Sequence, residues 1–228
     1  MNSLYKLYDY QEKLVKRTRK ALTRHQGVLV VSPAGSGKSV VIAEIARLTT
    51  QNQRPILFIV HRKELADQIE ANFQQNRVDM AYVTIMTVRK AANRLAELPE
   101  PSLIITDETH HSRAKSYQDI YTYFDQAYRL GFTASPWRLN GRGFDDLYGE
   151  MVEGPSVQWL IDHQFLAPYR YFAPKLADLS KLKRSSTGDF SKRSIDKAMK
   201  KAVFGDVVQH YQKLASGQQA ILYAHSVQ

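Results

Sequence analysis

The chain of 228 residues contains no cysteine, which excludes a disulfide framework and any metal site with thiolate ligands. No apolar run approaches the roughly 20 residues that a membrane-spanning helix needs. The first residues, Met1 to Lys6, form no apolar signal core, and the chain has no internal repeat. We therefore expect a cytoplasmic protein with one large core, or with one full domain and part of another.

Acidic residues are outnumbered by basic ones. The chain has 32 Lys and Arg against 22 Asp and Glu, which gives a formal net charge of +10 at pH 7. Such an excess favours a polyanionic partner, because a basic surface attracts nucleic acid and releases its counterions on binding. It is equally compatible with a basic surface that serves solubility alone, so charge by itself does not choose between the two.

Short apolar runs alternate with segments of helical periodicity. Apolar strands of this kind, separated by helices, favour an α/β fold with a parallel sheet covered by helices on both faces. The predicted strands are Val28–Val31, Ile56–Val60, Ala81–Met86, Leu103–Thr106 and Tyr128–Thr133. The predicted helices are Tyr10–Leu22, Ser39–Leu48, Lys63–Phe73, Pro155–His163 and Ala202–Leu214. Since ligands bind beyond the carboxyl ends of such strands, the loops after Val31, Val60, Thr106 and Phe132 are expected to hold the chemistry.

The composition changes after about residue 149. An extended segment is expected at Pro168–Ala173, and Lys175–Lys201 carries nine Lys and Arg against three Asp. We predict three parts: a nucleotide-binding domain at 1–170, a basic connector at 171–216, and the first strand of a truncated second domain at 217–228. That last strand is predicted at Ala220–Ala224.

The loop after the first strand has the composition of a phosphate-binding loop. Gly35-Ser36-Gly37-Lys38-Ser39 lies between a predicted strand and a predicted helix, which is the context that such a loop requires. The glycines let backbone N–H groups turn toward phosphate oxygens, and the helix N-terminus adds partial positive charge. Lys38 would reach the β- and γ-phosphates, and the Ser39 hydroxyl would bind Mg2+. The competing interpretation, a Gly/Ser turn that happens to contain a lysine, does not account for the strand and helix around it.

Two adjacent acids end the fourth predicted strand. Asp107 would hold Mg2+, and Glu108 would polarise the attacking water as a general base. An exposed acidic turn is the other interpretation, and the phosphate loop makes it the weaker one. The histidines that follow, His110 and His111, could suggest zinc, but no cysteine or further spaced ligand accompanies them.

These motifs, in this order, resemble superfamily 2 helicases of the DEAD/DEAH-box-like group, in the phage or prophage type that is related to restriction-enzyme motor subunits. The resemblance covers nearly the whole chain and implies a RecA-like P-loop NTPase fold with ATP and Mg2+ as cofactors. Tyr8-Asp9-Tyr10-Gln11 is similar to the family's adenine-recognition element, which implies that Gln11 reads the base edge. Asp107-Glu108-Thr109-His110 matches the acidic box, with Thr109 where Ala or Cys is usual, and implies that His110 links hydrolysis to the next motif.

The resemblance also implies contacts with nucleic acid. Arg62 and Thr87 stand in segments similar to the family's strand-contact motifs. Gly131-Phe132-Thr133-Ala134-Ser135-Pro136 is similar to the motif that couples hydrolysis to strand movement, which assigns that role to Thr133 and Ser135. The family's later motifs, including its arginine finger, would follow Gln228, and such a residue is worth about 10³–10⁵ in rate in hydrolases that use one.

We therefore expect an ATP-dependent helicase or translocase domain that acts on nucleic acid, with DNA favoured over RNA, in a bacterial or phage-infected cell. Taken alone, these 228 residues are expected to bind ATP and Mg2+, hydrolyse ATP slowly and unwind nothing. Three other hypotheses stay open: the motor of a restriction-type enzyme, a nucleic-acid clamp that ATP regulates without unwinding, and an ATP-binding fragment with no nucleic-acid role. The sequence does not indicate which replication or recombination proteins would be partners.

Overall fold

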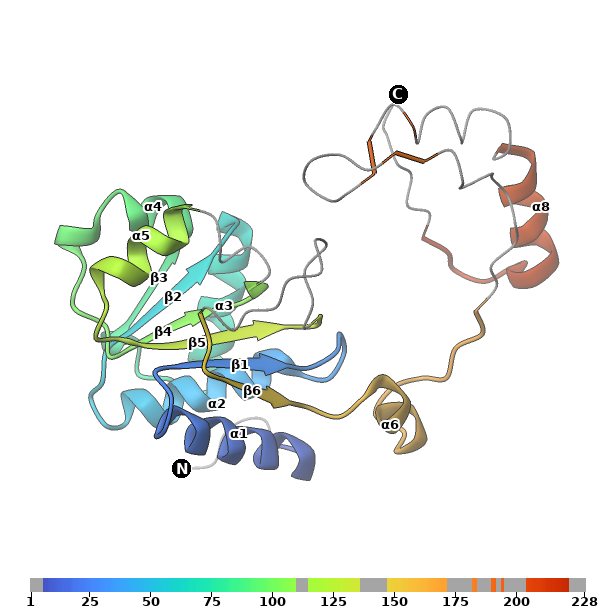
Figure 1. Ribbon diagram of the computed structural model, residues 1–228. Coiled ribbons are helices and arrows are strands. Elements are labelled where there is room, and N and C mark those ends of the chain that lie inside the picture. Colours follow the sequence, from blue (N-terminus) through green and yellow to red (C-terminus); the bar gives the residue numbers. More distant parts are fainter. Residues whose placement is uncertain are drawn as a thin grey trace. The chain divides into compact units, whose positions relative to one another are not determined.

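A computed structural model describes residues 6–109, 115–135, 147–171, 182–183, 190–191, 194 and 204–221. The chain divides into two compact units, Met1–Pro168 and Tyr169–Gln228. The first unit contains the sheet, which is drawn as arrows in Figure 1. Within the described residues of the second unit, the longest regular element is the helix α8 (Phe204–Ala215).

A parallel sheet forms the centre of the first unit. In the described residues its strand order is β3-β2-β4-β5-β1-β6, and every neighbouring pair is parallel. The strands are β1 (Gly27–Val31), β2 (Ile56–Val60), β3 (Val83–Thr87), β4 (Leu103–Thr106), β5 (Tyr128–Thr133) and β6 (Glu150–Glu153). Because all strands run the same way, the loops that follow them meet at one edge of the sheet.

The two faces of the sheet carry two separate apolar cores. Val28 and Val30 of β1 pack on the face covered by α1 (Asp9–Leu22), α2 (Lys38–Thr50) and α3 (Lys63–Gln75). Leu29, between them, packs on the opposite face with α4 (Val88–Ala92) and α5 (Lys115–Tyr123). Figure 1 shows α1 and α2 on one side of the sheet and α4 and α5 on the other. Successive side chains of a strand point to opposite faces, so strands covered on both sides need the continuous apolar runs found in the sequence.

The sequence prediction missed one strand. β6 pairs with β1 at the margin of the sheet, and only Val152 of its residues is buried. Glu150 and Glu153 give it no apolar run, since an edge strand needs to bury little. Two helices, α4 and α5, were also missed, and short 3-10 turns lie at Met80–Tyr82 and Leu95–Glu97.

The C-terminal expectations are only partly covered by the described residues. The helix α6 (Val157–Asp162) lies inside the predicted Pro155–His163, and α8 lies close to the predicted Ala202–Leu214. Residues 167–171 have no regular secondary structure. Most of the basic stretch and most of the last predicted strand lie outside the described residues. In the part of the chain that is described, no helix is both long and apolar enough to cross a bilayer.

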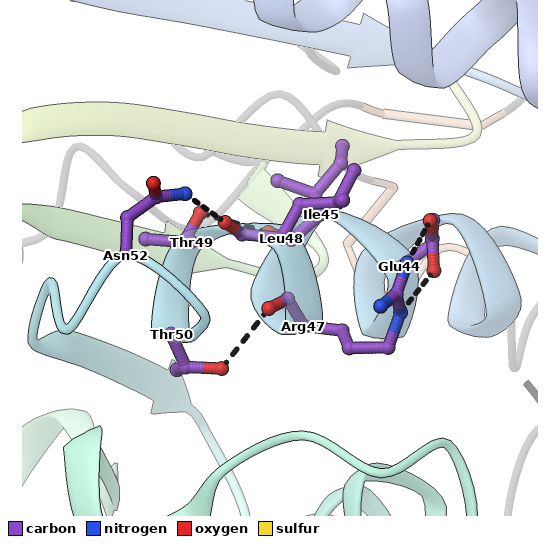
Figure 2. Close-up of polar contacts among 7 residues, drawn as sticks. All are labelled: Glu44, Ile45, Arg47, Leu48, Thr49, Thr50 and Asn52. Atoms are coloured by element: carbon purple, nitrogen blue, oxygen red, sulfur yellow. Dashed lines mark hydrogen bonds and ion pairs between the residues drawn. The ribbon is translucent and has the colours of Figure 1, made fainter. Parts of the chain in front are cut away.

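Side-chain contacts stabilise α2, the helix that follows the predicted phosphate loop (Figure 2). Arg47 donates two hydrogen bonds of 2.7 Å to the carboxylate of Glu44, and these bonds raise the pKa of Arg47. Asn52 Nδ2 donates to the Leu48 carbonyl over 2.8 Å, and Thr50 Oγ1 donates to the Arg47 carbonyl over 3.2 Å. The last carbonyls of a helix lack partners within the helix, so these side chains stabilise the C-terminal end of α2.

Candidate functional site

The predicted phosphate loop is the connection between β1 and α2. Gly35 and Gly37 have φ angles of 78° and 76°, in the left-handed region that side chains disfavour, and Gly37 is the N-cap residue of α2. A Cβ atom on Gly37 would collide with Nε2 of Gln11. The left-handed backbone at this position therefore favours glycine, and any larger residue would also displace the Gln11 amide.

Lys38 lies folded over the loop that precedes it. Its Nζ donates to the carbonyls of Ser32 and Pro33 over 3.1 and 3.2 Å. Ser36 Oγ donates to the same Pro33 carbonyl over 2.7 Å and lies 2.7 Å from Ser32 Oγ. The half-buried ammonium group is thus held by two neutral acceptors, and an anion placed over the loop would be a stronger acceptor for it.

Gln11 lies against the loop from the side of α1. Its Oε1 accepts from the Tyr8 backbone N–H over 3.0 Å, and its Nε2 donates to the Ser36 carbonyl over 3.3 Å. Tyr10 Oη donates to the same carbonyl over 3.0 Å. Gln11 is only 3% exposed, so its amide connects the start of α1 to the loop. Whether it also reads an adenine stays a prediction.

The acidic pair follows β4 at the same edge of the sheet. Glu108 has a φ of 52°, which is unusual for a residue with a side chain, and its N–H donates to Asp107 Oδ1 over 2.9 Å. A cavity of about 250 Å³ is lined by both acids and by Ser39 of the loop. A hydroxyl and a carboxylate are oxygen ligands of the kind that Mg2+ uses together with substrate phosphates, so this donor set fits the ion. His110 lies outside the described residues.

The residues assigned to coupling lie next to the loop. Thr133, the last residue of β5, stands opposite Val31 in the register, and its carbonyl accepts from the Ser32 N–H over 3.0 Å. Its Oγ1 accepts from the Ser135 N–H over 3.2 Å and donates to the Ser135 carbonyl over 3.0 Å. Thr133 is buried and Ser135 exposed, so the turn connects the base of the loop to the surface.

The residues assigned to nucleic-acid contact lie farther along the same edge. Thr87 stands opposite Val60 at the ends of β3 and β2, and it is the N-cap residue of α4. Arg62 is exposed and is the N-cap residue of α3. The strand order places β4 and β5 between the strands that carry these residues and β1, which carries the loop, so all of them share one edge of the sheet.

Sequence reasoning missed the wall of the cavity that α3 provides. Gln68 and Asn72 line it beside Leu65 and Ile69. Asn72 Oδ1 is buried and, among the described residues, has no hydrogen-bond partner. The i, i+3, i+4, i+7 spacing of these four residues was a signal that could have identified the face.

Most of the first unit matches the sequence model of a known protein family. Residues 4–94 and 76–138 match the family described as type III restriction enzyme, res subunit. A 51.5 kDa protein of a Lactococcus phage (isolate 7-9) is 54% identical over 200 residues, which cover 88% of this chain and 44% of the phage protein. The chain therefore spans less than half the length of that relative.

Solved structures with higher divergence share the fold. The UvsW helicase of bacteriophage T4 superposes with a TM-score of 0.53 at 19% identity, over 67% of this chain and 62% of that one. The ATP-dependent type ISP restriction-modification enzyme LlaBIII, bound to DNA, superposes with a TM-score of 0.57 at 17% identity, over 70% of this chain and 16% of that one. The predicted α/β fold of the RecA-like type is confirmed.

Proposed function

This chain belongs to the family of type III restriction enzyme res subunits and is a helicase-like or restriction-type motor domain, and on that basis we propose that it binds ATP with Mg2+ and couples ATP hydrolysis to movement on DNA. The observation that carries the proposal is the cavity where Ser39 of the phosphate loop meets Asp107 and Glu108. These groups follow β1 and β4 in the chain, and β5 separates these two strands in the sheet.

Each residue at the edge has a role in this proposal. The N–H groups of Gly35, Ser36 and Gly37 and the ammonium of Lys38 bind phosphate oxygens, where the ammonium exchanges its two carbonyl acceptors for an anion. Ser39 and Asp107 hold Mg2+, which neutralises phosphate charge when it is bound. Glu108 accepts a proton from the attacking water. Gln11 contacts the base.

Removal of the metal tests the nucleotide half of the proposal. ATP binding, followed by fluorescence of a labelled analogue, should be tight with Mg2+ and weaken by at least about tenfold in EDTA, because Ser39 and Asp107 would hold an ion that would neutralise phosphate charge. Equal ATP affinity with Mg2+ and in EDTA would mean that Ser39 and Asp107 do not form a metal site for the nucleotide.

DNA is the partner that best fits the charge and the family. The net charge of +10 favours a polyanion. Arg62 is exposed at the first turn of α3, where backbone N–H groups and a basic side chain can bind one phosphate together. Thr133 ends β5 and Ser135 follows it, and β5 lies between β2 and β1 in the sheet, so both residues stand between Arg62 and the loop along this edge, as a coupling role needs.

Arg62→Ala should weaken binding to single-stranded DNA by a similar factor for all sequences. Loss of one phosphate contact should lower the slope of log affinity against log salt by about one. Fluorescence anisotropy at several salt concentrations measures both quantities. Arg19→Ala is the matched control, because Arg19 is exposed in the last turn of α1, at the opposite edge of the sheet. If the Arg62→Ala variant binds DNA as tightly as the Arg19→Ala control, Arg62 does not contact the DNA.

The motor portion of a restriction-type enzyme is the second candidate, and the family match favours it. It would use the same residues for ATP and DNA. ATP-dependent DNA cleavage by a longer protein that contains this chain would select it, whereas unwinding without cleavage would select a helicase.

A further inference from the structure

Behind the acidic pair lies a group of buried hydroxyls, which we name the hydroxyl cluster: Thr106, Thr109, Tyr121 and Tyr148. All four residues are at most 6% exposed, and Thr109 is fully buried. Thr106 Oγ1 lies 2.9 Å from Tyr121 Oη, and Thr109 Oγ1 donates to the Thr106 carbonyl over 3.1 Å. A buried hydroxyl is costly unless it is hydrogen-bonded, so a cluster of this kind constrains the positions of its members.

Gly131 allows this cluster to pack directly against β5. It stands opposite Thr106 in the register of β4 and β5. A Cβ atom at Gly131 would lie 2.6 Å from Thr109 Oγ1 and 2.6 Å from Tyr148 Oη. Both hydroxyls therefore lie close to the backbone of Gly131, which has no side chain to separate them from the strand. Gly131 is two residues before Thr133. The acidic turn is thereby packed against the strand that carries the proposed coupling residues.

The Tyr121 phenol is neutral at neutral pH, because its pKa lies above the ordinary value of a tyrosine. Burial raises the pKa of Tyr121, and hydrogen bonds with Thr106 and Tyr148 and the nearby Arg129 lower it by less. The Arg129 guanidinium lies over the Tyr121 ring, 5.8 Å from its centroid. Burial also raises the pKa of the adjacent Tyr117 to about 12. The cluster therefore acts through hydrogen bonds and packing at neutral pH.

Thr109 closes the turn that contains Glu108. Its hydroxyl bonds to the carbonyl three residues earlier, so the bond spans Asp107 and Glu108. Between these two ends Glu108 adopts a φ of 52°, a conformation that persists only where the surroundings enforce it. On one side of the turn is the cavity lined by Ser39 and the two acids, and on the other is the hydroxyl cluster.

We propose that the Thr109 hydroxyl, supported by Tyr121 and Tyr148, is a positioning group that holds Glu108 in its left-handed conformation and so places its carboxylate for hydrolysis. The inference rests on the proposed function, since Glu108 is the general base there. The Thr109 hydroxyl forms a hydrogen bond across the acidic turn that a side chain without a hydroxyl, such as alanine or valine, could not form.

Three substitutions at one residue test this role. Thr109→Val keeps the shape and removes the hydroxyl, Thr109→Ala removes both, and Thr109→Ser keeps the hydroxyl. Single-turnover ATP hydrolysis should slow by about 10–100-fold in Thr109→Val and Thr109→Ala, because a displacement near 1 Å can cost that much. Thr109→Ser should stay within about threefold of the wild type, and ATP affinity should be unchanged in all three. Tyr148→Phe should slow hydrolysis in the same direction.

The outcomes separate positioning from a structural role and from failure of the proposed function. Hydrolysis at the wild-type rate in folded Thr109→Val or Thr109→Ala overturns the positioning role. The positioning role is also overturned if these variants have a lower melting temperature and a lower ATP affinity but hydrolyse bound ATP at the wild-type rate. If Thr109→Val does not fold, Thr109→Ala and Tyr148→Phe decide. Glu108→Gln runs beside them: if it hydrolyses ATP normally, the proposed function itself fails, whereas its inactivity beside a fully active Thr109→Val rejects only this inference.

Discussion

Glu108→Gln is expected to slow ATP hydrolysis by about 10²–10⁴-fold, the usual contribution of a positioned general base. The amide keeps the size of the side chain and cannot accept the proton of the attacking water. The N–H of residue 108 keeps its bond to Asp107 Oδ1, so the turn should be preserved. ATP affinity should therefore change little. Single-turnover hydrolysis of labelled ATP and an equilibrium titration measure the two quantities.

Glu100→Gln is the matched control for that change. Glu100 is exposed just before β4, at the opposite end of the strand that delivers Glu108. The Glu100→Gln variant should hydrolyse ATP at the wild-type rate. Turnover that survives in Glu108→Gln would mean that another group accepts the proton, and the assignment of Glu108 would be wrong.

Lys38→Ala is expected to weaken ATP binding by about 100-fold, because removal of one partner of a buried charge pair costs several kcal/mol. In the structure the ammonium already lies over the loop, 3.1 and 3.2 Å from the Ser32 and Pro33 carbonyls. No large rearrangement is needed to bring it to a phosphate. Titration with the labelled analogue in Mg2+ measures the effect.

Lys20→Ala serves as the control for Lys38→Ala. Lys20 lies in the last turn of α1 and is exposed, so its loss removes the same charge far from the loop. Its ATP affinity should match that of the wild type. If Lys38→Ala also bound ATP like the wild type, with an unchanged melting temperature, the loop would not be the phosphate site.

The interior of the fold could be predicted because burial on both faces leaves a clear pattern. Ile56–Val60 is apolar throughout and was assigned with the bounds that the structure has. At the margin of the sheet this pattern fades, and β6 was missed because Val152 alone is buried there. The helix α5 was missed because its buried face uses tyrosines, Tyr117 and Tyr121, among polar residues.

The meeting of Ser39 and Asp107 could be predicted, because both follow strands of an expected parallel sheet and both were assigned to one Mg2+. The two residues line the same cavity in the structure. The order of the strands, with β5 between β1 and β4, could not be predicted, because no local pattern contains it. The close approach of Thr109 to the backbone of Gly131 likewise depends on the register of β4 and β5, which no local pattern indicates.

The rate of ATP hydrolysis by the wild-type chain, measured in single turnover with and without single-stranded DNA, tests the central claim most directly. The claim is that the edge holding the phosphate loop and the acidic pair is an ATP site coupled to nucleic acid. It predicts slow hydrolysis that requires Mg2+ and becomes faster when DNA is added, with single-stranded RNA as the parallel arm that ranks the two polymers. Absence of Mg2+-dependent hydrolysis in every condition, or a rate that neither polymer changes, would contradict it.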